Sequence, residues 1–320
     1  MKTQTVKLFF AVLALCFLGG CGALNGPESI PSNAMIPTPS WTIQPPTITL
    51  TPIIAAPTYT PRPTLSADEA WSTIKGWLQD NDGCRFPCLW GFVPGETSVD
   101  AFQFAMARLG SVGDVSNYGK VGGFDVEFTI GDTLIPYGLS YRGTTTIEQL
   151  EVNAFGLRKV GDSTEGAPVF GDSPTSPLLH YYMPSQILSN YGQPSRVLIG
   201  AWYDDRLPPS ESDWKFSIVL DYSESGILVE YLIFGKASGN KFVGCLSRAQ
   251  DFTVWLWPPD EMNSLEEIVS SGSGGINELN VGWFKSIEVA TFTTLDEFYQ
   301  EFKEPSNTKC LETPVSLWKP

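Results

Sequence analysis

The chain has 320 residues, of which 42% are hydrophobic and 12% aromatic, enough to bury the core of one large or two small domains. It carries 35 acidic against 20 basic residues, a formal charge of −15. Phosphate binding depends on clustered Lys and Arg, which this chain lacks, so its composition excludes nucleic acid as a partner.

The N-terminal segment 1–20 has the pattern of a secretory signal. Lys2 and Lys7 precede an apolar run, Leu8 to Leu18, that is too short to span a bilayer comfortably, and the run ends in Leu18-Gly19-Gly20-Cys21. This segment resembles the lipobox of bacterial lipoproteins, which implies cleavage before Cys21 and acylation of its thiol, for example with palmitate. The alternative is an uncleaved hydrophobic anchor.

Export as a lipoprotein would place the protein at the cell envelope, facing away from the cytoplasm. Cleavage would remove Lys2 and Lys7 and no acidic residue, so the formal charge would change from −15 to −17. Anionic lipid headgroups would repel such a surface. We therefore expect the acyl chains alone to hold the protein on the membrane.

Residues 21–65 are predicted to form a stalk. Ten of the 25 prolines lie between Pro27 and Pro63, interleaved with Thr and Ser. Each proline fixes φ and removes an amide donor, so no packed element is expected. At about 3.1 Å per residue in the polyproline conformation, the stalk could hold a domain on the order of 100 Å from the membrane. A disordered leader without a spacing role is the alternative.

The globular region is expected over 66–320, with 66–177 and 178–320 as candidate subdomains. Four segments begin with a Ser or Thr followed three residues later by an acid and then by apolar residues at helical spacing, which predicts capped helices. These pairs are Ser66 with Glu69, Thr97 with Asp100, Ser264 with Glu267, and Thr294 with Glu297. A shorter helix is predicted from Pro184 to Tyr191, before Gly192.

Strands are predicted between these helices from apolar alternation. The expected strands are 124–130, 150–154, 214–222, 227–233, 251–257 and 287–292. Residues 223–226 should form the turn of a hairpin. Helices and antiparallel strands segregated in this way predict an α+β fold, with the helices packed on one face of the sheet.

Four cysteines remain after Cys16 leaves with the signal and Cys21 is acylated, and an oxidising compartment favours disulfides. Three connectivities are open. We favour Cys84 with Cys88, which are close neighbours around Phe86-Pro87, and Cys245 with Cys310. A four-thiolate zinc site is the alternative, although structural zinc pairs usually have closer spacing than Cys-x-x-x-Cys.

The order helix, glycine turn, meander occurs twice between Pro94 and Phe234. Gly95-Glu96-Thr97 and Tyr191-Gly192-Gln193-Pro194 are its motif-like residues. This order is similar to the unit of small envelope-assembly lipoproteins and, in tandem, of β-lactamase inhibitor proteins, which implies two tandem helix-meander units.

The segment Cys84 to Thr97, CRFPCLWGFVPGET, also resembles a recurring signature of bacterial lipoproteins with Pro/Thr-rich stalks. That family is uncharacterised, so the resemblance implies no activity.

Catalytic motifs are incomplete in this sequence. Gly161-Asp162-Ser163 and Gly171-Asp172-Ser173 match the nucleophile block of an esterase family. That family also requires Asp-x-x-His, whereas Pro177 stands three residues before His180, the only histidine. We therefore predict no catalytic residue, no metal ligand and no cofactor.

Aromatic side chains are the candidate binding residues. On the strand 251–257, Trp255 and Trp257 fall on the face opposite Phe252, Val254 and Leu256, where they could form a platform for a sugar ring or a partner protein. The alternative is that a second layer, for instance the helix from Leu295 to Phe302, covers both tryptophans.

Trp202 and Tyr203 are a second candidate, expected in a loop that continues to Pro208 and Pro209.

These patterns favour a lipid-anchored, extracytoplasmic module that binds an envelope protein or glycan, or acts structurally, without catalysis. The alternative is an exported hydrolase acting on polysaccharide or peptide, which needs two carboxylates about 5 to 10 Å apart in a cleft beside exposed aromatics. An enzyme inhibitor, with a concave sheet face lined by aromatics, is a third candidate.

Overall fold

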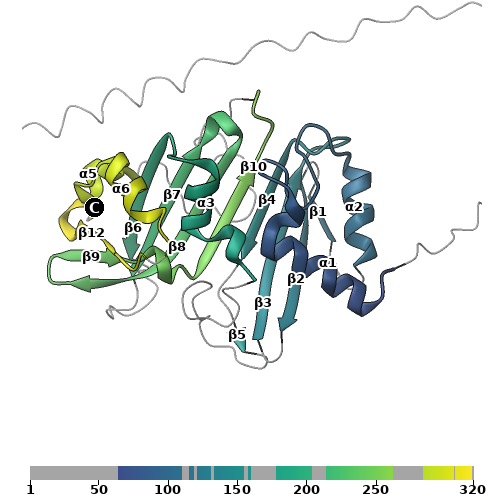
Figure 1. Cartoon of the computed structure of the whole chain (residues 1–320), viewed down its shortest axis with the longest axis horizontal. Helices are drawn as coiled ribbons and strands as arrows, with labels where there is room; N and C mark the ends of the chain where they lie inside the picture. The colour runs from purple at the N-terminus through teal and green to yellow at the C-terminus, as the bar shows by residue number, and fades with distance from the viewer. Residues whose placement is uncertain are drawn as a thin grey trace, which may run out of the picture. The chain divides into compact units, whose positions relative to one another are not determined.

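The computed structural model describes residues 64–109, 115–118, 121–130, 133–154, 158–159, 178–203, 214–261, 284–305 and 307–318. Every described residue belongs to one compact unit, Thr60–Pro320. Within that unit, helices accompany a large antiparallel sheet (Figure 1), which confirms the expected α+β class.

The helices begin close to where the sequence signals them. Their bounds are α1 (Ala67–Asp80), α2 (Val99–Arg108), α3 (Pro184–Tyr191), α5 (Ile287–Thr291) and α6 (Leu295–Phe302). Full capping boxes form at α1, between Ser66 and Glu69, and at α6, between Thr294 and Glu297. None of the helices in the described part of the chain is long and apolar enough to cross a membrane.

The start of α2 differs from the prediction by one residue. Ser98, not Thr97, is its N-cap, and the Ser98 hydroxyl accepts a hydrogen bond from the amide of Ala101. The Thr97 hydroxyl instead accepts from the amide of Val93, within the turn before the helix. The predicted helix after Ser264 lies outside the described residues.

The sheet runs in the order β1-β2-β3-β4-β10-β8-β7-β6-β11, with every pair antiparallel. Its strands are β1 (Val115–Tyr118), β2 (Val121–Ile130), β3 (Thr133–Arg142), β4 (Gln149–Ala154), β6 (Arg196–Tyr203), β7 (Trp214–Tyr222), β8 (Ile227–Ser238), β10 (Asp251–Leu256) and β11 (Lys285–Ser286). Three further strands lie off this path: β5 (Arg158–Lys159) pairs with β3, and β9 (Lys241–Gly244) pairs with β8 and β12 (Leu311–Pro314).

The order helix then meander occurs in both halves of the unit. Helix α2 precedes β1 to β4, and helix α3 precedes β6, β7, β8 and later β10. The last strands of the two meanders, β4 and β10, pair with each other, with Val152 opposite Val254. We call this β4–β10 pair the seam. Because of it, one continuous sheet passes through both halves.

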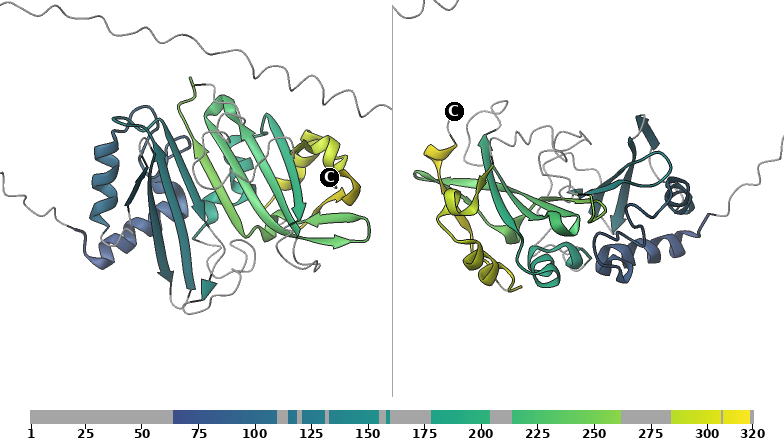
Figure 2. Two further views of the ribbon diagram at one scale, coloured as in Figure 1. Left: turned by 180° about the vertical axis from the view of Figure 1, so that it is seen from behind. Right: turned by 90° about the horizontal axis from the view of Figure 1, so that it is seen from above.

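One face of the sheet packs against the helices. Figure 2 shows α1, α3 and α6 on the same side of the sheet. Trp77 and Leu78 of α1, Ile187 of α3 and Phe298 of α6 join the inward-facing residues of the strands, such as Val254, in a single buried cluster. The opposite side, which we call the second face, has a smaller apolar cluster containing Leu198, Val219, Leu228, Trp255 and Trp257, against which Phe284 packs.

The strand predicted over 287–292 is wrong, because residues 287–291 form helix α5. Ile287 and Ala290, three residues apart, are buried in the main core, and α5 packs against β12 and β6. A short apolar run does not distinguish helix from strand by periodicity, so its tertiary contacts decided the conformation.

Both predicted disulfides are present. Cys84 is bonded to Cys88 and Cys245 to Cys310, with Cα atoms 5.8 Å and 4.0 Å apart. The second links the start of η4 (Leu246–Arg248) to the start of β12. The four-thiolate zinc alternative is therefore wrong in this structure, because a disulfide sulfur is not a thiolate.

Candidate functional site

Polar and acidic side chains gather on the second face, around the seam. Successive residues of a strand point to opposite faces, so the residues between core positions of β4, β8 and β10 share this face. We call seven residues there the seam cluster: Gln149, Glu151, Asn153, Glu230, Asp251, Trp255 and Trp257. Glu151 lies directly opposite Trp255 in the sheet.

Glu230 is an acidic residue of this cluster whose ionisation is perturbed. Burial raises the pKa of its carboxyl to about 7, and the charges of Asp251 and Glu151 act in the same direction. The Ser217 hydroxyl donates a 2.5 Å hydrogen bond to Glu230 Oε1, which lowers this pKa. Burial prevails, so near neutral pH Glu230 is protonated in a substantial fraction of molecules.

Trp255 and Trp257 do not form the exposed platform that was one interpretation of the sequence. Both are on the second face, as the alternation predicts, but each has 0% exposed surface. The helix suggested as their cover, α6, instead places Phe298 and Phe302 in the core on the other side of the sheet. A partner protein therefore cannot dock flat on these two rings in this structure.

Trp202 and Tyr203 are the last residues of β6, not part of a loop. Trp202 is half-buried, and the residues after Tyr203, with Pro208 and Pro209, lie outside the described chain. His180 is exposed at the start of η2 (His180–Tyr182). The two Gly-Asp-Ser motifs also lie outside the described residues.

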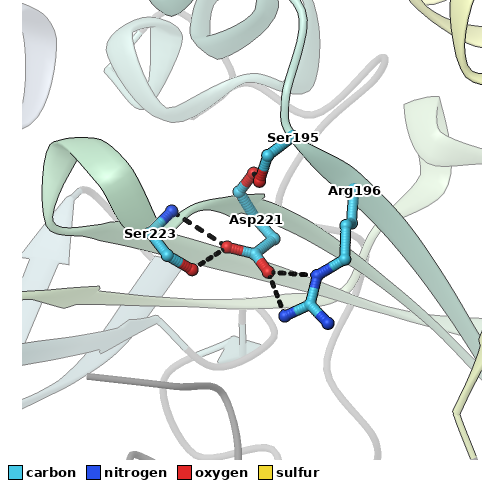
Figure 3. Close-up of polar contacts among 4 residues, drawn as sticks. All are labelled: Ser195, Arg196, Asp221 and Ser223. Carbon is cyan, nitrogen blue, oxygen red and sulfur yellow. Dashed lines mark hydrogen bonds and ion pairs between the residues drawn. The ribbon is translucent and has the colours of Figure 1, made fainter. Parts of the chain in front are cut away.

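A second buried acid on this face, Asp221, has a structural role. Figure 3 shows its carboxylate between Arg196 and Ser223: Arg196 Nε and Nη2 donate to Oδ2 at 2.8 and 2.6 Å, and the Ser223 amide and hydroxyl donate to Oδ1. The Ser195 hydroxyl donates to the Asp221 backbone carbonyl at 2.8 Å. Asp221 is 1% exposed and its acceptors are occupied, so it fixes the β6–β7 pairing and the turn after β7.

The signature segment Cys84 to Thr97 is also used for packing. Within the Cys84–Cys88 loop, the Phe86 ring stacks on Tyr191 of α3 with centroids 5.7 Å apart and meets Tyr181 edge-on at 5.3 Å. The Phe86 amide donates to the Tyr191 hydroxyl at 2.8 Å. This loop therefore attaches the end of α1 to the second helix-meander unit.

The next part of the signature is fixed by a buried chain of hydrogen bonds. Trp90 stacks on Trp77 of α1, with centroids 4.9 Å apart, and its indole N–H donates to the Tyr182 hydroxyl at 2.7 Å. Tyr182 donates in turn to the Trp77 carbonyl, and its own carbonyl accepts from the Tyr231 hydroxyl of β8 at 2.9 Å. Burial raises the pKa of both Tyr182 and Tyr231, so these hydroxyls remain donors. The signature thus joins α1, η2 and the sheet.

The most exposed large apolar side chains of the described residues lie on α5 and at the residue that follows it. Phe292 is 81% exposed and Val289 56%, while Ile287 and Ala290 of the same helix are buried. Phe292 ends the helix at φ 61°, a left-handed conformation that costs a non-glycine residue about 1 to 2 kcal/mol. An aromatic side chain that is both strained and exposed contributes little to folding.

A shallow groove adjoins Phe292 and continues along α6. It is lined by Phe292, Thr293, Glu297, Gln300, Glu301 and Lys309. We call these six residues together with Val289 the tip. Glu301 forms an ion pair with Lys309, and hydrogen bonds from the Thr294 amide and hydroxyl lower the pKa of Glu297.

Several contacts hold the tip rigidly on the fold. The capping box fixes the start of α6, and the Asn307 side-chain amide donates to the Glu301 carbonyl at 2.6 Å. The disulfide from Cys310 to Cys245 ties the following chain to η4, and β11 pairs with β6 just before α5. The groove therefore has a fixed shape before any partner arrives.

Sequence reasoning missed both the tip and the charge state of Glu230. The tip was missed because residues 287–292 were interpreted as a strand, which hides the exposed pair Val289 and Phe292. Glu230 was missed because its environment comes from Ser217 and Asp251 on neighbouring strands. Among the described residues, no group of three or more His, Cys, Asp or Glu side chains is arranged to hold a metal ion.

Comparison of the chain with models of known protein families, with curated proteins and with solved structures finds no match.

Proposed function

We propose that this protein is a lipid-anchored, extracytoplasmic binding module of the cell envelope that acts without catalysis and docks a partner protein through its tip. The lipobox at Cys21 and the proline-rich stalk support the location. The two disulfides fit an exported domain.

The observation that carries this proposal is the exposed, left-handed Phe292. Glycine or asparagine would fit its backbone better, and 81% of its surface contacts solvent, so the fold gains little from a phenylalanine there. Aromatic anchors at the centre of an interface supply much of the binding free energy of protein complexes. Phe292, with Val289 beside it, is suited to that role.

The charges around this anchor indicate the chemistry of the partner. Glu297 and Glu301 line the groove, and Glu288 and Asp296 are exposed on the same two helices. Lys309 already forms an ion pair with Glu301. A partner that presents an apolar residue flanked by Lys or Arg would complement this surface.

A photo-crosslinking side chain at position 292, in the full-length chain expressed in its own host, tests the proposal. We expect one discrete adduct with an envelope protein, and loss of that complex in Phe292→Asn, a variant whose fold should be at least as stable as the wild type. Phe104 on α2 is 39% exposed and serves as the matched control position. The proposal would be contradicted if positions 292 and 104 crosslink to the same extent, or if neither position crosslinks.

The alternative, an exported hydrolase, finds no support at the tip. Glu297 and Glu301 lie one helical turn apart beside Phe292, but Glu297 caps α6 with a lowered pKa and Glu301 pairs with Lys309. Neither carboxyl is arranged to donate a proton.

One observation at the seam favours the hydrolase, namely the pKa of about 7 at Glu230, within reach of the charges of Asp251 and Glu151. Incubation of the purified protein with cell-wall polysaccharide and with peptides discriminates the two functions. Release of reducing ends or amines that is lost in Glu230→Gln would establish hydrolysis, whereas absence of turnover together with crosslinking at position 292 supports the binding module.

The inhibitor interpretation requires exposed aromatics on the sheet, and the two seam tryptophans are covered.

A further inference from the structure

The disulfide between Cys245 and Cys310 lies directly beside the groove of the tip. Lys309, the residue before Cys310, is the basic residue among the six that line this groove. The residue after Cys310, Leu311, begins β12 and pairs with Gly244 of β9. The disulfide therefore fixes the connection from α6 to β12 at the point where it passes the groove.

Cys310 is also the most accessible of the four bonded cysteines. It is exposed, whereas Cys84, Cys88 and Cys245 are half-buried. A thiolate must reach a disulfide sulfur to attack it, so exposed disulfides are the ones that reductants open most readily in folded proteins. Access therefore favours attack by an external thiol at Cys310, beside the groove.

The contacts that Lys309 makes besides the disulfide are weak or local. Its ammonium group forms an ion pair with Glu301, but 70% of the Lys309 side chain is exposed, and an exposed ion pair does little to hold a chain in place. Its amide donates to Asn307 Oδ1 at 2.7 Å, a contact within the same connection. Once the disulfide opens, the ion pair with Glu301 is free to dissociate.

The rest of the groove does not depend on the disulfide. Glu297 and Glu301 belong to α6, which is held on the fold by its capping box and by the buried rings of Phe298 and Phe302. Helix α5, which ends before Phe292, is anchored by its own buried residues. Opening the disulfide would therefore displace the basic residue of the groove and leave the aromatic anchor and both acids in place.

We propose that the Cys245–Cys310 disulfide is a redox latch, which an external dithiol protein opens to release Lys309 from Glu301. In the oxidised state Lys309 neutralises Glu301. In the reduced state the groove presents the charges of Glu297 and Glu301 to the Lys or Arg residues of the partner, which should bind more tightly. The effect on the partner rests on the proposed function, whereas the release of Lys309 does not.

The exchange transfers two electrons and two protons from the dithiol to the protein. The first thiol of the reductant attacks Cys310 Sγ as a thiolate, a mixed disulfide forms, and Cys245 leaves and takes up the proton that this thiol released. The second thiol then attacks the reductant sulfur of the mixed disulfide, and Cys310 leaves as a thiol. The reductant ends as a disulfide and the protein cystine as two thiols.

Reduction of the folded full-length protein with dithiothreitol tests the latch without a partner. Alkylation followed by peptide mass spectrometry should label Cys245 and Cys310 before Cys84 and Cys88. Hydrogen exchange should then become faster at the amides of residues 307–310, while the amides of α6 stay protected.

Three results of this experiment would overturn the proposal. The first is that Cys84 and Cys88 are labelled as early as Cys245 and Cys310. The second is that the latch opens only when the whole domain loses its protection, which would make the bond purely structural. The third is that it opens and hydrogen exchange at residues 307–310 does not change.

Crosslinking at position 292 measures the effect on the partner. Reduction should raise the apparent affinity about two- to fivefold, the change that one exposed ion pair produces. Lys309→Ala should give the same rise in the oxidised protein, and reduction of that variant should add nothing. Lys241→Ala, which removes an exposed ion pair with Glu312, is the matched control and should leave crosslinking unchanged.

The crosslinking result separates the latch from the docking function. An adduct formed equally by the oxidised protein, the reduced protein and Lys309→Ala would contradict the latch and leave docking intact. Absence of any adduct in both redox states would contradict docking, and the latch would then be decided by the alkylation and hydrogen exchange alone.

Discussion

Two acids on the same face of the sheet, Asp221 and Glu230, have different hydrogen-bond partners. Asp221 accepts hydrogen bonds from Arg196 and from two groups of Ser223. Glu230 accepts from the neutral Ser217 hydroxyl and lies near Asp251 and Glu151, so the burial of its carboxyl is not offset. The pKa of Glu230 therefore depends on groups of neighbouring strands as well as on its own burial.

The raised pKa of Glu230 predicts that the protein is more stable at pH 5 than at pH 7.5. In the unfolded chain the carboxyl releases its proton near its ordinary value of 4.5, whereas the folded state retains it up to about pH 7. The unfolded state therefore binds fewer protons across this window, and the free energy of unfolding falls as pH rises. Glu230→Gln should remove this pH dependence, which amounts to a change in unfolding free energy on the order of 1 to 3 kcal/mol between pH 5 and pH 7.5.

Urea denaturation at pH 5, 6 and 7.5 measures this effect, with Glu224→Gln as the control because Glu224 is exposed. Parallel pH profiles for the wild type and Glu230→Gln would show that the carboxyl ionises normally in the folded protein.

At the scale of elements, Gly226 links the β7–β8 turn to the end of β10. Its φ is +68°, its carbonyl accepts from the Trp257 amide at 3.0 Å, and a Cβ atom there would lie 2.1 Å from the Trp257 carbonyl oxygen. The turn predicted from Ser223-Glu224-Ser225-Gly226 thus also positions one of the seam tryptophans.

Gly226→Ala should therefore destabilise the protein more than an equivalent change at Gly239. Both glycines have positive φ, but a Cβ atom added at Gly239 would meet no other atom within 4 Å. Alanine should cost about 1 to 2 kcal/mol at Gly239, from the backbone alone, and about 3 kcal/mol or more at Gly226. Thermal unfolding of the two variants compares them directly. Similar losses of stability would mean that the contact with Trp257 relaxes freely.

The elements that the sequence predicts well are those with local signals. Helices α3 and α6 match their predicted bounds, and so does β7. Their signals are a proline start, a capping box and an apolar run that ends at a turn, and each lies in consecutive residues. Strands β1, β9 and β12 have four residues each, too few for alternation to mark them, and β12 has its partner β9 far away in the chain.

The candidate site follows the same division. Alternation correctly places Trp255 and Trp257 on the face opposite Val254, but burial depends on what lies over that face, which a single strand does not encode. The cysteine pairing was favoured correctly, by proximity for Cys84 and Cys88 and by elimination for Cys245 and Cys310. The tip depends on α5 being a helix, which only its packing determines.

At the scale of the whole molecule, the two disulfides should contribute unequally to stability. Cys245 and Cys310 are 65 residues apart in sequence, whereas Cys84 and Cys88 are four apart. On the chain-entropy argument, closing the longer loop contributes about 4 kcal/mol and the shorter about 2 kcal/mol. The longer bridge should also keep the tip in place.

Cys245→Ser with Cys310→Ser should therefore lower the free energy of unfolding about twice as much as Cys84→Ser with Cys88→Ser, measured by denaturation of the double variants. A larger loss from the short bridge would indicate that the signature packing around Phe86, and not loop closure, is what that disulfide protects.

Because β4 pairs with β10, the sheet cannot be completed until β10 has been synthesised. β4 ends at Ala154 and β10 begins at Asp251, so about a hundred residues must be synthesised before β4 has a neighbour on that side. A strand edge without a neighbour is a template for pairing with another chain. The N-terminal half is therefore prone to aggregation while the residues between β4 and β10 are being synthesised. Residues 149–154 are where a chaperone would protect it.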